Sequence, residues 1–310
     1  MVIATRLEDI KIREDQRTCI TLGKFDGIHR GHQKLFEVCR EKSNGDILTA
    51  FTFDFSIRKV LTGKMNGNLF SKEEKRALMS EQGVELLVEC PFTDDIRTME
   101  PDRFVRDILV NKLHARTIII GDDFHFGCNR AGDAGLLQSM SKECGYEFFR
   151  VDMVTDKRGL EIGSTEIREA LLQGRMEVVN ELLGFAYFAD GRVVHGNHIG
   201  GKIGSPTINQ LPGEDKLLPP FGVYCSKVII DGREYKAVTN IGCKPTVSDG
   251  KIPGIETYIL DFNEKIYGEN VRTCLYHYLR PERVFECVDE LAKQIKIDSE
   301  NAARYWSEVD

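Results

Sequence analysis

Two histidines, His29 and His32, end a glycine-rich stretch that begins at Gly23 and reads Gly-Lys-Phe-Asp-Gly-Ile-His-Arg-Gly-His. The stretch follows a β-rich run and opens a helical pattern, where glycines let a ligand approach the backbone and the first helical turn presents N–H groups to an anion. Imidazoles at this spacing fall on one helix face. We expect a phosphate site that stabilises charge on an attacked phosphate without supplying a nucleophile. For an isolated His-x-x-His pair, surface polar residues or metal ligands would be the simpler interpretation.

A second glycine-rich stretch begins at Gly200 and ends on Pro-Thr-x-Asn, with Thr207 and Asn209. Residues two apart in an extended strand point to the same side, so this hydroxyl and this amide oxygen can both reach one Mg²⁺ or its waters. The stretch is not a Walker loop, because G-x-x-x-x-G-K-[ST] is missing from this part of the sequence. Taken alone, Pro-Thr-x-Asn is more often a turn.

The elements that position the first stretch alternate β-rich runs with helical patterns, which is typical of a parallel sheet covered by helices. Helices are indicated by the spacing of Leu35, Val38 and Cys39, by a capping box at Ser71 and Glu74, and by Pro101 in a first turn. A further helix over residues 164–172, closed by Gly174, has Ile167, Ala170 and Leu171 on one face. We predict strands at residues 18–22, 47–53, 85–89, 117–120 and 147–151, and a Rossmann-like α/β domain over residues 1–184.

The pattern changes near Gly184 to shorter alternating strands separated by glycine-rich turns, at residues 187–194, 222–230 and 235–240. Asp231 and Gly232 form a hairpin signal between two of these strands. A terminal helix is predicted from near Pro281, because Val284, Val288, Leu291 and Ile295 recur at three- and four-residue steps. We therefore expect a small antiparallel β-barrel with a terminal helix over residues 185–310.

Composition excludes several classes of protein. With 310 residues, 41% hydrophobic and 29% charged, the chain has the composition of a globular protein of two domains. A net charge of −7 argues against nucleic-acid binding, and no apolar stretch is long enough to span a bilayer. The charged first residues do not resemble a signal peptide, and nine cysteines at irregular spacing indicate reduced thiols. We expect a cytoplasmic protein with no membrane partner.

In this context the first stretch resembles the nucleotidylyltransferase superfamily, and more narrowly the G-x-F-D-G-x-H-x-G-H form of bacterial bifunctional FAD synthetases. The resemblance implies that His29 and His32 are catalytic and contact ATP phosphates. A second superfamily element corresponds to Gly163–Arg168, with Gly163 in place of the first of two expected hydroxyl residues. The ATP-binding residues that the resemblance implies in this half are Gly23, Phe25, Asp26, Gly27, Gly31, Ser164, Thr165 and Arg168.

Residues 121–127 are similar to the flavin-side loop of the same family, which implies flavin contacts for Asp123, Phe124 and Phe126. His125 takes the place of the usual arginine. Core aromatics at a strand end are the alternative for the two phenylalanines. The strand ending that in the family usually carries Pro-His-Pro reads Phe-Thr-Phe-Asp-Phe-Ser at residues 51–56 here.

The second half resembles riboflavin kinase through Pro-Thr-x-Asn, residues 218–224, residues 240–246 and residues 256–262. The resemblance implies that Gly200 and Lys202 bind ATP, that Thr207 and Asn209 bind ATP and Mg²⁺, and that Glu256 is the general base toward a ribityl hydroxyl. Arg280 matches the start of a loop that folds over flavin. An exposed strand glutamate and a surface arginine are the alternatives, and Gly201 replaces the usual basic residue.

The two resemblances together imply a bifunctional enzyme that phosphorylates riboflavin to FMN with ATP and then adenylylates FMN to FAD and pyrophosphate. Riboflavin, FMN and ATP would be its small-molecule partners, Mg²⁺ its cofactor, and flavin-requiring apoproteins possible recipients of FAD. The replacements at Gly163, Gly201 and Pro-His-Pro motivate two alternatives. One is a flavin- or nucleotide-binding regulatory protein, and the other is an enzyme that retains one activity.

Overall fold

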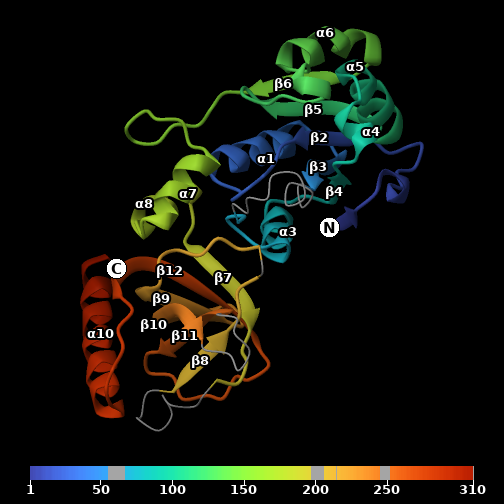
Figure 1. The fold of residues 1–310 in the computed structure, drawn as a ribbon. Helices are drawn as coiled ribbons and strands as arrows, with labels where there is room; N and C mark the ends of the chain where they lie inside the picture. Colours follow the sequence, from blue (N-terminus) through green and yellow to red (C-terminus); the bar gives the residue numbers. More distant parts are fainter. Residues whose placement is uncertain (55–66, 197–205, 214, 245–251, 310) are drawn as a thin grey trace. The chain divides into compact units, whose positions relative to one another are not determined.

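The structure is a computed structural model that describes residues 1–54, 67–196, 206–213, 215–244 and 252–309 (Figure 1). Contacts within the chain divide it into two compact units. The first comprises Met1–Asn66 and Lys75–Gly163, and the second comprises Gly67–Glu74 and Ser164–Asp310. Each unit is therefore assembled from two separate stretches of sequence.

The first unit is built on a six-stranded sheet with the order β1-β4-β3-β2-β5-β6, in which all neighbouring strands are parallel. This confirms the predicted α/β class and all five predicted strands. The short edge strand β1 is an addition that the alternation of longer runs does not reveal. The bounds are β1 (Val2–Ala4), β2 (Thr18–Leu22), β3 (Ile47–Asp54), β4 (Leu86–Pro91), β5 (Ala115–Gly121) and β6 (Glu147–Val151).

Side-chain alternation along these strands sends one set of residues to each face of the sheet. Ile20 and Ile118 pack in one core with Leu109 and Leu137, which come from helical segments. Cys19, adjacent to Ile20, points the other way, and its thiol donates to the Cys39 carbonyl of α1 at 3.6 Å. The helical segments are α1 (Arg30–Lys42), α3 (Lys72–Glu81), α4 (Asp94–Arg97), α5 (Pro101–Arg103) with a π-helix over Phe104–Lys112, and α6 (Ala134–Cys144). A 3₁₀ turn lies at Leu7–Asp9 and another at Cys128–Arg130.

Local signals at the helix ends are confirmed. Ser71 and Glu74 form the capping box at α3, with Ser71 N to Glu74 Oε2 at 2.7 Å and Glu74 N to Ser71 Oγ at 3.2 Å. Pro101 occupies the first turn of α5. Gly174 follows α7 (Ser164–Leu172) with a φ of 69°, the left-handed conformation that glycine favours.

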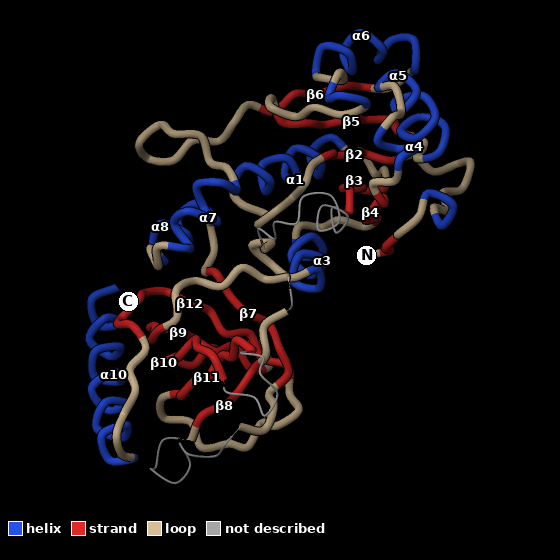
Figure 2. Tube along the Cα trace, viewed as in Figure 1, coloured by secondary structure: helices blue, strands red, loops and turns tan. Residues whose placement is uncertain are grey.

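The second unit contains a six-stranded sheet with the order β7-β12-β9-β10-β11-β8, in which all neighbouring strands are antiparallel. Just after the edge strand β7, Val194 N donates to Asn209 O of the other edge strand, β8, at 2.8 Å, so the sheet curls into a small barrel (Figure 2). Asp231 and Gly232 both have positive φ in the β9–β10 turn, as an Asp-Gly hairpin requires. The strands are β7 (Tyr187–Arg192), β8 (Thr207–Gln210), β9 (Gly222–Ile230), β10 (Arg233–Lys244), β11 (Ile252–Ile259) and β12 (Asn270–Pro281).

The terminal helix starts later than predicted, and the prediction of a start near Pro281 is wrong. Pro281 is the last residue of β12, where it pairs with Gly222, and α10 covers Val288–Val309. Val284 lies outside the helix and is 99% exposed. The four-residue step from Val284 to Val288 suits a helix, but the chain leaves the β12–β9 ladder at Pro281 and becomes helical only at Val288.

The second unit also includes Gly67–Glu74, α7 and α8 (Met176–Leu183). Glu74 Oε2 accepts from Lys216 Nζ at 2.7 Å, and both side chains are almost completely buried. The ammonium of Lys216 also lies 4.4 Å from the ring centre of Phe70 and 4.5 Å from that of Tyr187. Burial lowers the pKa of Lys216 to about 8, against the attraction of Glu74. These contacts attach residues 67–74 to the barrel, and the predicted border between residues 184 and 185 stays a prediction.

Candidate active sites in the two units

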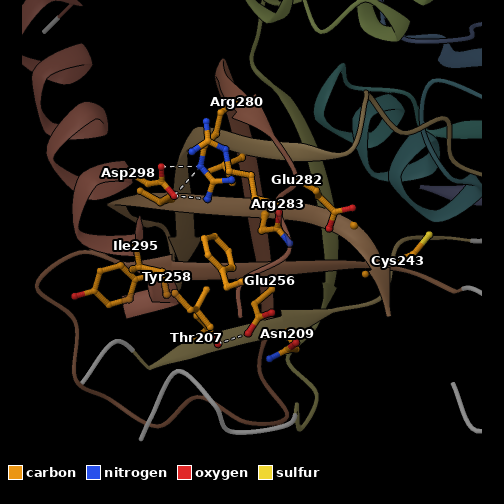
Figure 3. A pocket seen from close by; sticks show the side chains of 17 residues that line it. Thr207, Asn209, Cys243, Glu256, Tyr258, Arg280, Glu282, Arg283, Ile295 and Asp298 are labelled. Carbon is orange, nitrogen blue, oxygen red and sulfur yellow. Dashed lines mark hydrogen bonds and ion pairs between the residues drawn. The ribbon is translucent and has the colours of Figure 1, made fainter. Parts of the chain in front are cut away.

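A pocket of about 330 Å³ lies between the barrel sheet and the first half of α10 (Figure 3). Strand register builds its floor, because Asn209 pairs with Glu256, and Glu256 pairs with Asn240. Thr207 lies two residues before Asn209 and therefore shares its side of the sheet. The alternation predicted from the sequence is confirmed here, since all four side chains line the same pocket.

Glu256 and Thr207 are joined directly across β8 and β11. The Thr207 hydroxyl donates to Glu256 Oε1 at 2.7 Å. Asn209 is 5% exposed, and its amide is confined by Gly196, where a Cβ would lie 2.3 Å from Asn209 Nδ2. The site thus presents a carboxylate, a hydroxyl and a sterically fixed amide on one side of the sheet.

The opposite side of the pocket carries an ion pair (Figure 3). The Arg280 guanidinium donates to Asp298 through Nε at 2.9 Å and through its second terminal nitrogen at 2.6 Å. Gln294 Nε2 donates to the same carboxylate at 2.9 Å. Leu291 and Ile295, on the same helix, also line the pocket. The apolar stripe expected of the terminal helix therefore covers a cavity, whereas Ala302 and Trp306 anchor α10 to the barrel core.

The loop after β12 contributes Glu282 to the pocket wall. A Cβ at Gly242 would lie 2.5 Å from the Glu282 carboxyl carbon, so a larger residue here would displace the end of this side chain. The Asn-Ile-Gly motif at residues 240–242 thus has a steric role that the sequence alone does not reveal.

The structure brings together Thr207, Asn209, Glu256 and Arg280 from separate motifs. Gly200 and Lys202 lie outside the described residues. Asp298 and Gln294 are additions that the sequence analysis misses. The only available signal was that Asp298 follows Ile295 by three residues and so continues the helix stripe.

In the first unit, the loop between β2 and α1 carries the histidine motif. Phe25, Gly27 and Ile28 have φ values of 50°, 93° and 45°, so the chain turns sharply before His29 caps the helix. Phe25 is completely buried and packs against His32, with ring centres 5.3 Å apart. Its side chain is part of the core, so a contact between Phe25 and ATP would involve its backbone.

His29 and His32 are stacked, with ring centres 3.8 Å apart and an angle of 28° between the planes. The Nδ1 atoms of both are buried and have no hydrogen-bond partner among the described residues. Burial lowers the pKa of His29 to about 4, against the attraction of Asp26. Burial, followed by the charges of His29 and Lys75, lowers the pKa of His32 well below its ordinary value. Both imidazoles are therefore neutral at pH 7.

The loop after β5 holds the three residues predicted to bind flavin. Phe126 is 3% exposed and belongs to the core of the unit, with its ring centre 5.6 Å from that of Phe104. Phe124 is half-buried against the same core, and Asp123 is exposed. Phe126 supports the loop from within the core, whereas Phe124 and Asp123 are at least partly exposed and accessible to a ligand. The flavin contacts of this loop stay a prediction.

The second nucleotidylyltransferase element opens α7 and groups with the second unit. Ser164 is its first residue and Thr165 is exposed. The guanidinium of Arg168 donates to the Gly67 carbonyl. The predicted contacts of these three residues with ATP stay predictions.

Comparisons with known proteins give a family match for each half of the chain. A family model described as FAD synthetase matches residues 11–166, and one described as riboflavin kinase matches residues 183–306. The bifunctional riboflavin kinase/FMN adenylyltransferase of Listeria monocytogenes is 32% identical over 302 residues, which cover 96% of this chain and 95% of the relative. The chain belongs to this family. The family member from Escherichia coli K12 is 32% identical over 296 residues, with 94% of each chain covered.

A solved structure extends the likeness to the fold. The crystal structure titled macrolide-efflux protein from Streptococcus pneumoniae superposes with a TM-score of 0.84 at 30% identity, covering 97% of this chain and 98% of that one. Within the described residues, no helix is both long and apolar enough to cross a bilayer.

Proposed function

We propose that this chain converts riboflavin to FMN at the barrel pocket and FMN to FAD at the histidine site, with the residue roles given below. The observation that carries the kinase assignment is the contact between Thr207 and Glu256 beside Asn209. Family membership supports both reactions.

In the kinase reaction the acceptor is the terminal ribityl hydroxyl of riboflavin. Glu256 takes the proton of that hydroxyl as its oxygen attacks the γ-phosphorus of ATP and ADP leaves. Thr207, by donating to Glu256, keeps the carboxylate turned toward the pocket. Arg280 and the apolar side chains of α10 form the opposite wall, where the flavin ring binds.

The oxygen atoms of Thr207 and Asn209 suit Mg²⁺. Mg²⁺ is usually held by one or two carboxylates together with substrate phosphates and water, and not by a cage of protein ligands alone. In keeping with this, the described residues contain no cluster of three or more His, Cys, Asp or Glu suited to a metal. When bound, Mg²⁺ neutralises charge on the transferred phosphoryl group.

In the adenylyl transfer an oxygen of the FMN phosphate attacks the α-phosphorus of ATP, and pyrophosphate leaves. FMN supplies the nucleophile, so the protein has only to position the phosphates and stabilise charge. Neutral His29 and His32 donate hydrogen bonds to the phosphates from Nε2, because Nδ1 of both rings is buried. The backbone from Gly23 to Gly31, with Asp26 and Gly27, forms the rest of this ATP site.

The surroundings of the enzyme are also part of the proposal. We place it in the cytoplasm, where ATP and reduced thiols prevail, and expect flavin-requiring apoproteins to receive its FAD. Nine cysteines at irregular spacing support this, as does the absence of a spanning helix within the residues described.

Product chromatography tests the proposal. Purified protein is incubated with ATP, Mg²⁺ and either riboflavin or FMN, and FAD is expected in both reactions. Glu256→Gln should lower FMN formation from riboflavin by about 100-fold or more, because general-base catalysis contributes about that much. FAD formation from added FMN should persist.

Glu264→Gln, at an exposed glutamate outside the pocket, is the matched control and should leave both activities intact. Full kinase activity in Glu256→Gln would refute its role as the base. If the native chain does not convert FMN, it retains the kinase activity only. Flavin binding without turnover would support the regulatory alternative.

A further inference from the structure

The two histidines that define the site bring no positive charge to it. Both imidazoles are neutral at pH 7, because burial holds the pKa of His29 to about 4 and that of His32 well below its ordinary value. Asp26, in the same loop, is acidic and acts on His29. A triphosphate is a polyanion, so neutral rings beside a carboxylate need cations nearby to balance its charge. Lys24 and Arg30 lie in the same stretch of sequence.

A lysine outside the motif lies at this loop. Lys75, on α3, donates from Nζ to the Lys24 carbonyl at 2.6 Å and to Thr52 Oγ1 at 3.3 Å. Thr52 is 2% exposed at the end of β3, and its hydroxyl also donates to the Lys24 carbonyl, at 3.3 Å. The ammonium is thus fixed on the backbone of the glycine loop, one residue after Gly23.

The charge of Lys75 also has an electrostatic effect on His32. Its charge is one of the causes that lower the pKa of His32, after burial and the charge of His29. The carboxyl ends of parallel strands, where β2 and β3 meet this lysine, are the edge at which open α/β sheets bind ligands. The hydrogen bonds of Lys75 and its position at the sheet edge therefore point the same way.

We propose that Lys75 adds a fixed positive charge to the adenylyl-transfer site, where its ammonium contacts the phosphates of ATP while His29 and His32 donate neutral hydrogen bonds. This inference rests on the proposed function of the first unit. As the bond from the α-phosphorus to the bridging oxygen breaks, negative charge grows on the departing pyrophosphate, and a fixed ammonium stabilises it.

Charge-changing variants test the inference in the full-length chain. Lys75→Gln keeps a donor near the Lys24 carbonyl but removes the charge, and Lys75→Arg keeps the charge. We expect Lys75→Gln to lower kcat/KM for ATP in FAD formation from FMN by about 100-fold, the usual loss for one stabilising group. Lys75→Arg should retain most of the activity. FMN formation from riboflavin should not change in either variant, which checks that the chain is folded.

Lys142→Gln, at an exposed lysine of α6, is the matched control for the loss of one positive charge. A second measurement separates charge from structure: NMR titration of the imidazole protons should show a higher pKa for His32 in Lys75→Gln than in the native chain. Equal FAD formation by Lys75→Gln and Lys142→Gln would overturn the inference.

A native chain that makes no FAD would instead refute the proposed adenylyl transfer. In that case calorimetric titration with ATP tests whether Lys75 contacts the phosphates. Weaker ATP binding by Lys75→Gln than by Lys142→Gln would support its contact with phosphate, and equal binding would overturn it.

Discussion

Acid should destabilise the first unit through His29. Its pKa is about 4 in the folded chain against an ordinary value of 6.5, because burial disfavours the imidazolium. Between these two pH values the unfolded chain carries a proton on His29 that the folded chain does not, so the free energy of unfolding falls as the pH falls. The contribution of the neutral ring is fully present above pH 6.5 and is lost below about pH 4.

The magnitude follows from the difference between the two pKa values, since each pKa unit corresponds to about 1.4 kcal/mol. His29 is 6% exposed, so solvent screens the effect little. The stability of the first unit should therefore fall by about 3 kcal/mol between pH 6.5 and pH 4 on account of this residue. His32, whose pKa is lowered in the same direction, adds to the decline.

Urea unfolding at several pH values between 4 and 7.5 measures the effect. Circular dichroism follows both units, whereas fluorescence of Trp306, the only tryptophan of the chain, follows the second unit alone. His29→Gln should flatten the pH dependence of the first unit by about 3 kcal/mol. His125→Gln, at an exposed histidine, should leave it unchanged. Parallel pH curves for the native chain and His29→Gln would refute the reasoning.

Three further changes test the packing around the sites. Gly242→Ala should raise KM or lower kcat for riboflavin, with a combined loss of up to about 100-fold, because the new methyl group displaces Glu282. Lys216→Met should destabilise the second unit by about 3–5 kcal/mol, because Glu74 is then buried without its cation. Phe126→Ala should destabilise the first unit by about 3–5 kcal/mol, since its ring fills the core beneath the flavin-side loop.

Each of these changes has its own readout. FAD formation from FMN should be normal in Gly242→Ala, and an unchanged kinase would show that Glu282 moves aside at no cost. For Lys216→Met, an unfolding midpoint by Trp306 fluorescence equal to that of the native chain would argue against the buried pair. For Phe126→Ala, calorimetry should show a lower unfolding temperature of the first unit. An unchanged unfolding temperature would argue against a role of the ring in the core.

Much of the fold could be predicted because local patterns and tertiary packing agree. The five predicted strands of the first sheet are apolar runs bounded by helical patterns, and Asp231 with Gly232 selects a hairpin turn on its own. Strand β1 was not predicted, because three residues are too few to show the alternation of a strand. The start of α10 was misjudged because pairing of Pro281 with Gly222 overrides a periodicity that suits a helix.

Some site residues could likewise be predicted from local patterns, and others could not. Thr207 and Asn209 could be placed together because strand alternation fixes their side, and Glu256 joins them by register. Asp298 and Lys75 could not, because each reaches its site from a helix whose packing no local motif encodes. Family resemblance indicates which residues do chemistry, whereas partners that hold them in place depend on tertiary contacts.

The kinase unit includes a short segment, Gly67–Glu74, that lies within the sequence of the first unit. Phe70 and Glu74 precede most of the first unit in sequence, yet they enclose Lys216 of the barrel. The two halves are therefore interleaved, not tandem, and one cut at residue 184 leaves Lys216 on a fragment without its carboxylate. A separable kinase would need the 67–74 segment grafted back or Lys216 replaced by an apolar residue.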